Sequence, residues 1–267
     1  MENSQKMKQE MLQKLKAFCL FDDDFMSKVF EDNYECIELI LHIIMDKPDL
    51  KVQIAQIQYS IKNLEGRSVR LDIHAIDTIG KKYNIEVQRE DKGASPKRAR
   101  YNSSVIDTKS LPAGAEFEEL PETYVIFITK NDVIGYNKPL YHIDRVIKET
   151  GELFGDEEHI VYVNGAYQDE SPLGKLMHDF SCSNPEDMYY KLLADRTRYF
   201  KEDEKGVAEM CELMEDLVDS GKKDEREEIA LRMLNSGRIS IEEIAEFTKM
   251  TVDEVKMLEE NEKLVTP

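Results

Sequence analysis

The stretch SVRLDIHAIDTIGKKYNIEVQRE, residues 68–90, decides how the centre of the chain folds. Apolar and polar residues alternate over residues 69–75 and again over residues 83–88. This period of two is typical of strands that have one apolar and one polar face. Gly80 lies between the two runs and suits a turn, because glycine accepts backbone conformations that other residues avoid. The stretch therefore predicts a β-hairpin.

The polar face of this hairpin gathers three oxygen-bearing side chains. A hairpin centred near residue 79 places Asp72 opposite Glu86, because each lies seven residues from that centre. Gln88 then points the same way as Glu86, since side chains two apart on a strand share a face. Carboxylate and amide oxygens, with water completing the shell, are the ligands of a hard divalent cation such as Mg²⁺. The same three side chains would also suit the solvated face of an antiparallel hairpin.

Length and cysteine usage bound the class of protein. The 267 residues suffice for one well-buried domain and a small appendage. The four cysteines are scattered without the spacing of metal ligands, which favours a reducing cytoplasm over a disulfide scaffold. The charged N-terminus lacks the apolar core of a signal peptide, and the apolar runs are too short to span a bilayer. We therefore expect a cytoplasmic protein that has no membrane segment.

Charge is unevenly distributed along the chain. There are 36 lysines and arginines against 55 aspartates and glutamates, and the formal net charge of −19 argues against nucleic-acid binding by the chain as a whole. Residues 81–100, however, hold seven basic residues against three acidic ones and overlap the end of the carboxylate hairpin. Because local sign decides where a polyanion docks, this basic stretch is a candidate contact for a phosphate backbone.

Helical and extended patterns flank the hairpin. Ser95–Pro96 has the residue types of an N-cap and a first helical position, so a helix carrying Lys97, Arg98 and Arg100 is expected to follow. The run TYVIFIT, residues 123–129, predicts a strand buried on both faces. The remaining expectations are helices over residues 5–19, from an N-cap at Asp24, over residues 33–45 and from Asn184 to about Phe200, and strands within residues 50–61, 139–147 and 159–164.

Residues 201–267 form a separate helical tail in this interpretation, and residues 1–200 form the main domain. The tail begins with a charged helix that Gly221 is expected to interrupt, and Ser240 and Thr251 each open a short helix with a capping box. The apolar residues of these two helices face each other as in a small helix-turn-helix: Ile241, Ile244, Ala245 and Phe247 against Val252, Val255 and Leu258. The tail holds 20 acidic against 10 basic residues, which favours packing or homo-oligomer formation over DNA reading.

Together these features resemble a known fold. A strand with Asp72, a turn, a strand with Glu86-x-Gln88 and a basic helix are similar to the core of PD-(D/E)xK nucleases. More closely, DFMSKVF, RLDIHAID, YNIEVQRE, TYVIFIT and MYYKLLADRTRYF resemble the Rpn family of recombination-promoting nucleases and transposases, over roughly residues 20–200. The resemblance implies an α/β fold with a restriction-endonuclease-like core, in which helices flank a mixed central sheet and a helical C-terminal tail follows.

The resemblance also implies a Mg²⁺-dependent DNA endonuclease that hydrolyses phosphodiester bonds, leaves 3′-hydroxyl and 5′-phosphate ends and promotes recombination. Asp72, Glu86 and the backbone carbonyl of Val87 would bind the metal. Gln88 would complete the catalytic set, in the position of the motif lysine. The residues expected to hold DNA phosphates without reading sequence are the basic ones of the following helix, which would equally suit a solvated helix face: Lys97, Arg98 and Arg100.

Several positions depart from the superfamily pattern or leave it open. Gln88 can orient a water but supplies no charge, so a catalytically weakened interaction or DNA-binding module is the alternative function. Leu71 stands where the motif has proline. A further acid from the first helix would be Glu35 or Glu38, and His74 is more often structural than a ligand. A third hypothesis is a DNA-binding regulator that acts through the C-terminal helices.

Overall fold

The computed structural model describes residues 2–63 and 66–265. The chain divides into two compact units, Leu12–Val207 and Met1–Met11 with Ala208–Pro267. The predicted domain boundary after residue 200 stays a prediction, because compactness does not test whether a part folds alone. The larger unit contains the hairpin and is described first.

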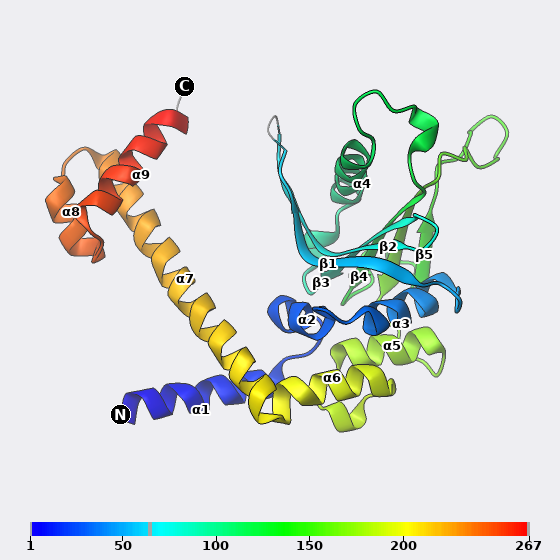
Figure 1. Cartoon of the computed structure of the whole chain (residues 1–267), viewed down its shortest axis with the longest axis horizontal. Helices are drawn as coiled ribbons and strands as arrows, with labels where there is room; N and C mark the ends of the chain where they lie inside the picture. The colour runs from blue at the N-terminus through cyan, green and yellow to red at the C-terminus, as the bar shows by residue number, and fades with distance from the viewer. Residues whose placement is uncertain (1, 64–65, 266–267) are drawn as a thin grey trace. The chain divides into compact units, whose positions relative to one another are not determined.

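One six-stranded mixed sheet forms the centre of the larger unit, in the order β1-β2-β3-β4-β6-β5 (Figure 1). The first three strands are antiparallel neighbours, β3, β4 and β6 run parallel, and β5 is an antiparallel edge. The strands are β1 (Val52–Ile61), β2 (Val69–Asp77), β3 (Lys82–Gln88), β4 (Thr123–Thr129), β5 (Leu140–Ile143) and β6 (Glu158–Asn164). This architecture confirms the expected mixed α/β fold.

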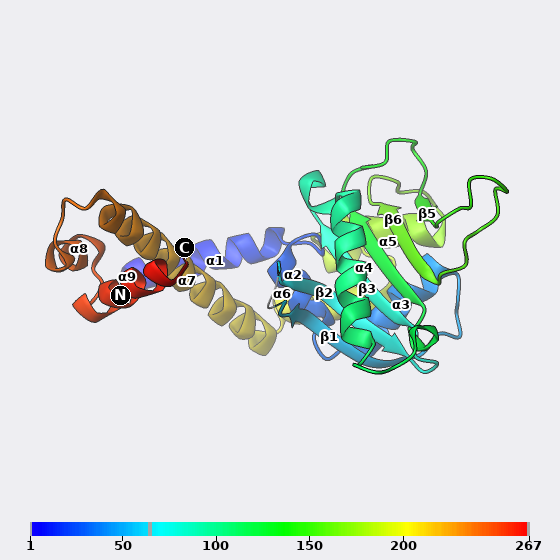
Figure 2. The ribbon, with the colours of Figure 1, turned by 90° about the horizontal axis from the view of Figure 1, so that it is seen from above.

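Helices cover both faces of this sheet. Helix α4 (Pro96–Ser110) lies on one face, and α2 (Asp23–Phe30) and α3 (Tyr34–Met45) lie on the other, as Figures 1 and 2 show. Helices α5 (Pro172–Ser181) and α6 (Lys191–Glu202) pack against α2 and α3 on that same side. Short 3-10 turns η1 (Asp91–Ala94), η2 (Phe117–Glu119) and η3 (Pro185–Asp187) lie between the elements. Because β4 is sandwiched between layers, every residue of TYVIFIT is buried, which confirms the prediction for this run.

The hairpin has the predicted register. Ile73 pairs with Ile85 and Ala75 with Tyr83, so the pairing is centred on residue 79. Gly80 has φ +88°, a conformation that glycine adopts without steric cost. Residues 71–75 of β2 and 83–87 of β3 are all buried, the polar ones included, so the polar side chains of the hairpin centre are not solvated. The alternative reading as a solvated hairpin face is therefore wrong.

Two helix starts differ from the sequence prediction. Asp24 was expected as an N-cap, but α2 begins at Asp23 and its N-cap is Asp22, two residues before the expected one. The segment from Asn184 was expected to be one helix, but it forms the 3-10 turn η3 and then a new helix from Lys191. Buried Asp179 explains this break, because its carboxylate accepts the backbone N–H groups of residues 189 and 190 at 2.8 Å each.

Replacing Asp179 by alanine is expected to lower the free energy of unfolding by about 3 kcal/mol, because two charge-assisted hydrogen bonds are lost and two N–H groups are left without an acceptor. Asp179→Asn keeps one acceptor oxygen and should cost about half as much. Urea unfolding monitored by circular dichroism measures the effect. Glu170→Ala removes an exposed carboxylate of the neighbouring loop and serves as control. A similar stability for both alanine variants would contradict this role.

The smaller unit is helical in its described part. Helix α7 (Glu204–Ser236) runs through Gly221 without interruption, contrary to the prediction. One glycine costs about 1 kcal/mol in a helix interior, which does not break a helix of this length. Helix α1 (Glu2–Ala17) spans the boundary between the units.

The last two helices, α8 (Ile241–Thr248) and α9 (Val252–Val265), have the predicted capping boxes at Ser240 and Thr251. They pack with the end of α7 around a small core of Ala230, Ile244, Ala245 and Val255. Phe247 was expected in this core, but its side chain is 69% exposed. Within the described residues, no helix is both long and apolar enough to cross a bilayer.

Candidate active site

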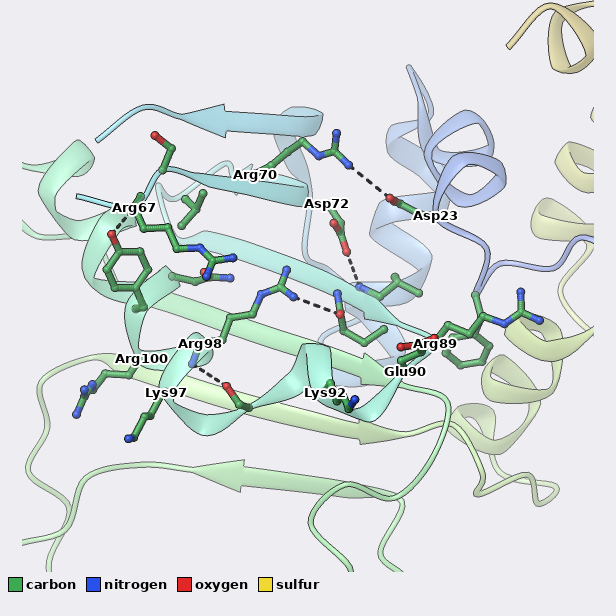
Figure 3. Close-up of a pocket in the computed structure, with 18 of the residues that line it drawn as sticks. Asp23, Arg67, Arg70, Asp72, Arg89, Glu90, Lys92, Lys97, Arg98 and Arg100 are labelled. Carbon is green, nitrogen blue, oxygen red and sulfur yellow. Dashed lines mark hydrogen bonds and ion pairs between the residues drawn. The ribbon is translucent and has the colours of Figure 1, made fainter. Parts of the chain in front are cut away.

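An open cavity of about 1280 Å³ lies where β3 ends and β2 begins, beside the N-terminal turns of α2 and α4 (Figure 3). Its lining is rich in charged side chains of both signs. The basic ones are Arg67, Arg70, Arg89, Lys92, Lys97, Arg98 and Arg100. The acidic ones are Asp22, Asp23, Asp72 and Glu90. An excess of positive charge around a few carboxylates suits a polyanion that docks over a cation site.

Asp72 lies at the point where the hairpin opens. The backbone pairing of β2 with β3 ends at Ile73 and Ile85. Beyond it, Asp72 Oδ2 accepts a hydrogen bond from the backbone N–H of Val87 at 2.9 Å, a contact drawn in Figure 3. The carboxylate thus occupies a place that a backbone carbonyl would take in a continued ladder. The same register continued by one pair sets Asp72 across from Glu86.

Glu86 lies behind the cavity wall and is fully buried. Its Oε1 accepts from Asn84 Nδ2 at 3.1 Å, and its Oε2 accepts from Arg98 Nη2 at 2.7 Å. A buried carboxylate requires such partners, since an unpaired buried charge is strongly unfavourable. Arg98 comes from the first turn of α4, where Ser95 caps the helix by accepting from the Arg98 backbone N–H.

Both carboxylates are costly to ionise in the folded protein. Burial and then the neighbouring Glu86 raise the pKa of Asp72 to about 8. Burial also raises the pKa of Glu86, although the Arg98 guanidinium acts in the opposite direction. One arginine therefore does not neutralise the pair, and a bound cation would favour the ionised form of both groups.

Gln88 and Arg98 meet at the edge of the cavity. Gln88 Oε1 accepts from Arg98 Nη1 at 3.3 Å, and the same nitrogen donates to the Gly93 carbonyl at 3.0 Å. A Cβ at Gly93 would lie only 1.7 Å from Gln88 Oε1. Glycine at this position of η1 therefore leaves the space that the Gln88 side chain occupies.

The other expected residues are placed differently. Lys97 and Arg100 line the cavity but point away from the carboxylates in Figure 3. Glu38 accepts from Lys51 Nζ and from the Val52 backbone N–H, both at 2.9 Å, and is turned toward β1. Neither Glu38 nor Glu35 lines the cavity.

His74 is also outside the cavity lining. It stacks on Tyr59 with ring centroids 5.3 Å apart. Its Nδ1 has no hydrogen-bond partner among the residues that the structure describes. Burial lowers the pKa of His74 to about 4, so the imidazole is neutral at physiological pH. These contacts support a structural role for this histidine.

The sequence prediction did not single out several cavity residues, among them Asp22, Asp23 and Arg70. Arg70 ion-pairs with Asp23 at 3.5 Å, and Arg89 ion-pairs with Asp22. Arg70 was detectable, because it precedes Asp72 by two residues on one strand and so lies on the same side. The two aspartates begin α2, and only the packing of that helix brings them to the cavity.

The side chains present suit a hard divalent cation in their chemistry. Asp72 and Glu86 supply carboxylate oxygens, and their raised pKa values mark negative charge that the protein leaves partly uncompensated. Among the described residues, no three His, Cys, Asp or Glu side chains are grouped to hold a metal. A cation here would therefore depend on two carboxylates together with backbone and water oxygens.

The mixed sheet and the carboxylate pair of its hairpin define an α/β protein of the PD-(D/E)xK type. A family model described as PD-(D/E)XK nuclease family transposase matches residues 26–168, more than half of the chain. The chain belongs to this family, which confirms the superfamily expected from the sequence. Comparison with curated proteins and with solved structures gives no match. Membership supports a nuclease or transposase-associated role, implies DNA as substrate, and is consistent with divalent-metal use, which is general among PD-(D/E)xK nucleases.

Proposed function

We propose that this protein is a Mg²⁺-dependent DNA endonuclease that hydrolyses phosphodiester bonds and promotes recombination, in the manner of the Rpn family. The observation that supports it most directly is the buried pair of Asp72 and Glu86 beside a cavity whose charged lining holds more arginines and lysines than carboxylates. The carboxylates provide a cation site, and the basic lining provides phosphate contacts.

In this proposal Asp72, Glu86 and the Val87 carbonyl hold the metal, which when bound supplies Lewis-acid chemistry at the scissile phosphate. The Val87 N–H fixes one oxygen of Asp72, and Asn84 fixes one oxygen of Glu86. Gln88 lines the cavity and orients the attacking water through its amide. These side chains are held before substrate arrives, which reduces the reorganisation that the reaction requires.

In this proposal the basic side chains along α4 and the adjoining strands bind the phosphates of the DNA. Lys97 and Arg100 contact successive backbone phosphates rather than base edges, so sequence preference is expected to be weak. We also propose that the protein is cytoplasmic and forms a homo-oligomer through its C-terminal helices.

The alternative function is a catalytically weakened interaction or DNA-binding module. One observation favours it: both oxygens of Glu86 already accept hydrogen bonds, from Asn84 and Arg98. A cation would have to share or displace these donors. Gln88 also carries no charge that would assist hydrolysis.

Supercoiled plasmid incubated with the full chain separates the two functions. In Mg²⁺ we expect nicked and linear products that carry 5′-phosphate and 3′-hydroxyl ends, and in EDTA we expect none. End labelling by polynucleotide kinase after phosphatase treatment, compared with labelling without it, identifies the 5′-phosphate. Plasmid that stays intact in both Mg²⁺ and Mn²⁺, while gel shift shows it bound, would instead support the alternative.

A further inference from the structure

The carboxylate pair has two acidic groups, whereas the guanidinium of Arg98 that contacts it carries one positive charge. The charge of Glu86 acts on Asp72, and among the described residues Arg98 forms an ion pair with Glu86 at 2.7 Å. The Arg98 side chain is 38% exposed, whereas Glu86 is fully buried, so the guanidinium lies between the carboxylate and the open cavity. Arg98 is therefore the positive group of α4 placed where a scissile phosphate would approach the carboxylates.

We propose that Arg98 is a catalytic residue that contacts the scissile phosphate and supplies the positive charge that Gln88 lacks. This inference rests on the proposed nuclease function. In hydrolysis, the water oxygen bonds to phosphorus and the P–O3′ bond breaks. One water hydrogen stays on the new phosphate oxygen, and the other proton ends on the leaving 3′ oxygen. Negative charge on the non-bridging oxygens is where guanidinium N–H donors act.

The donor count of the guanidinium leaves capacity for a phosphate. Arg98 uses Nη2 on Glu86 and Nη1 on both Gln88 and the Gly93 carbonyl. A guanidinium has five N–H donors in a planar fork, so donors remain for an oxygen that enters from the cavity. Gln88 carries no charge, and in this proposal it positions Arg98 by accepting a hydrogen bond from the guanidinium.

Arg98 differs from its basic neighbours in direction. Figure 3 shows its side chain extending toward the end of β3, whereas Lys97 and Arg100 extend to the opposite side of α4. Within the site, Arg98 forms an ion pair with the carboxylate of Glu86. The three residues were expected to act alike on DNA phosphates, and the geometry separates Arg98 from the other two.

The test compares variants of the full chain in a steady-state nicking assay. Arg98→Gln is expected to lower kcat about 100-fold or more, because one preorganised cationic donor is lost. Arg98→Lys keeps the charge but not the fork, and should recover about tenfold of that loss. The double variant Arg98→Gln with Gln88→Lys should also recover about tenfold. Lys97→Gln is expected to act mainly on KM, and Lys148→Gln, at an exposed position outside the cavity lining, should match the parent.

A second readout needs no cleavage. Ca²⁺ titrated into the DNA-free protein should raise its melting temperature, and Arg98→Gln should shift the midpoint to about tenfold lower Ca²⁺, because a repelling charge beside Glu86 is removed. The melting curve also shows whether the variant is folded. Arg98→Lys, which keeps the charge, should leave the Ca²⁺ midpoint close to that of the parent.

Three outcomes would overturn the inference. Arg98→Gln could cleave within threefold of the parent, it could lose activity only through KM as Lys97→Gln does, or it could leave the Ca²⁺ midpoint unchanged. If the parent itself does not cleave in Mg²⁺ or Mn²⁺, the proposed function fails. The Ca²⁺ titration then still tests the placement of Arg98, and an unchanged midpoint would overturn that placement independently.

Discussion

Replacing Glu86 by glutamine is expected to reduce plasmid cleavage at least about 1000-fold, because the substitution keeps the shape of the side chain and removes its charge. The glutamine carbonyl still accepts a hydrogen bond from Asn84 or Arg98, so the fold should persist. A neutral amide binds Mg²⁺ far more weakly than a carboxylate does. Initial nicking rates at equal protein concentration and saturating Mg²⁺ measure the effect.

Glu38→Gln is the matched control for this substitution. Glu38 is a largely buried glutamate of α3 whose oxygens bond to Lys51 and Val52. Its conversion should leave cleavage within about threefold of the parent. If Glu86→Gln nicked DNA as fast as Glu38→Gln at every Mg²⁺ concentration, the carboxylate pair would not be the metal site. Loss of activity in both variants with intact melting curves would move the site toward α3.

The hairpin was predictable because the residues that determine it are close together in the sequence. Alternation over two runs and a glycine between them predict the register, which when continued by one pair sets Asp72 across from Glu86. The burial of Glu86 was not predictable in the same way. It depends on α4 covering one face of the sheet and on Arg98, twelve positions later in the chain, reaching back to the strand.

The break in the helix expected from Asn184 has a cause outside that segment. Local residue types favoured one helix from Asn184, but Asp179 takes two backbone N–H groups that the helix would have used. A side chain that competes for backbone donors across a turn is invisible to a periodicity argument. The same applies to Asp23 and its pairing with Arg70, which depends on how α2 packs against the sheet.

Replacing Asp72 by asparagine is expected to stabilise the metal-free protein, and increasingly so as pH rises. The raised pKa of Asp72, about 8 in the folded protein, lies well above the ordinary value of 3.8. Between these values the folded protein keeps a proton that the unfolded chain has released, so stability of the parent falls as pH increases. Asparagine does not titrate, and its amide oxygen can still accept from the Val87 N–H.

Urea unfolding in EDTA at pH 5, 6.5 and 8 measures this difference. The advantage of Asp72→Asn over the parent should be about 2–4 kcal/mol larger at pH 8 than at pH 5, and should level off above pH 8. Asp49→Asn, at an exposed position, should show no such trend. Adding 10 mM Mg²⁺ at pH 8 should stabilise the parent by about 1–2 kcal/mol for a dissociation constant near 1 mM, and the variant by less. An advantage that stays constant across pH would show that Asp72 does not carry the raised pKa, and the variant's gain would then come from packing alone.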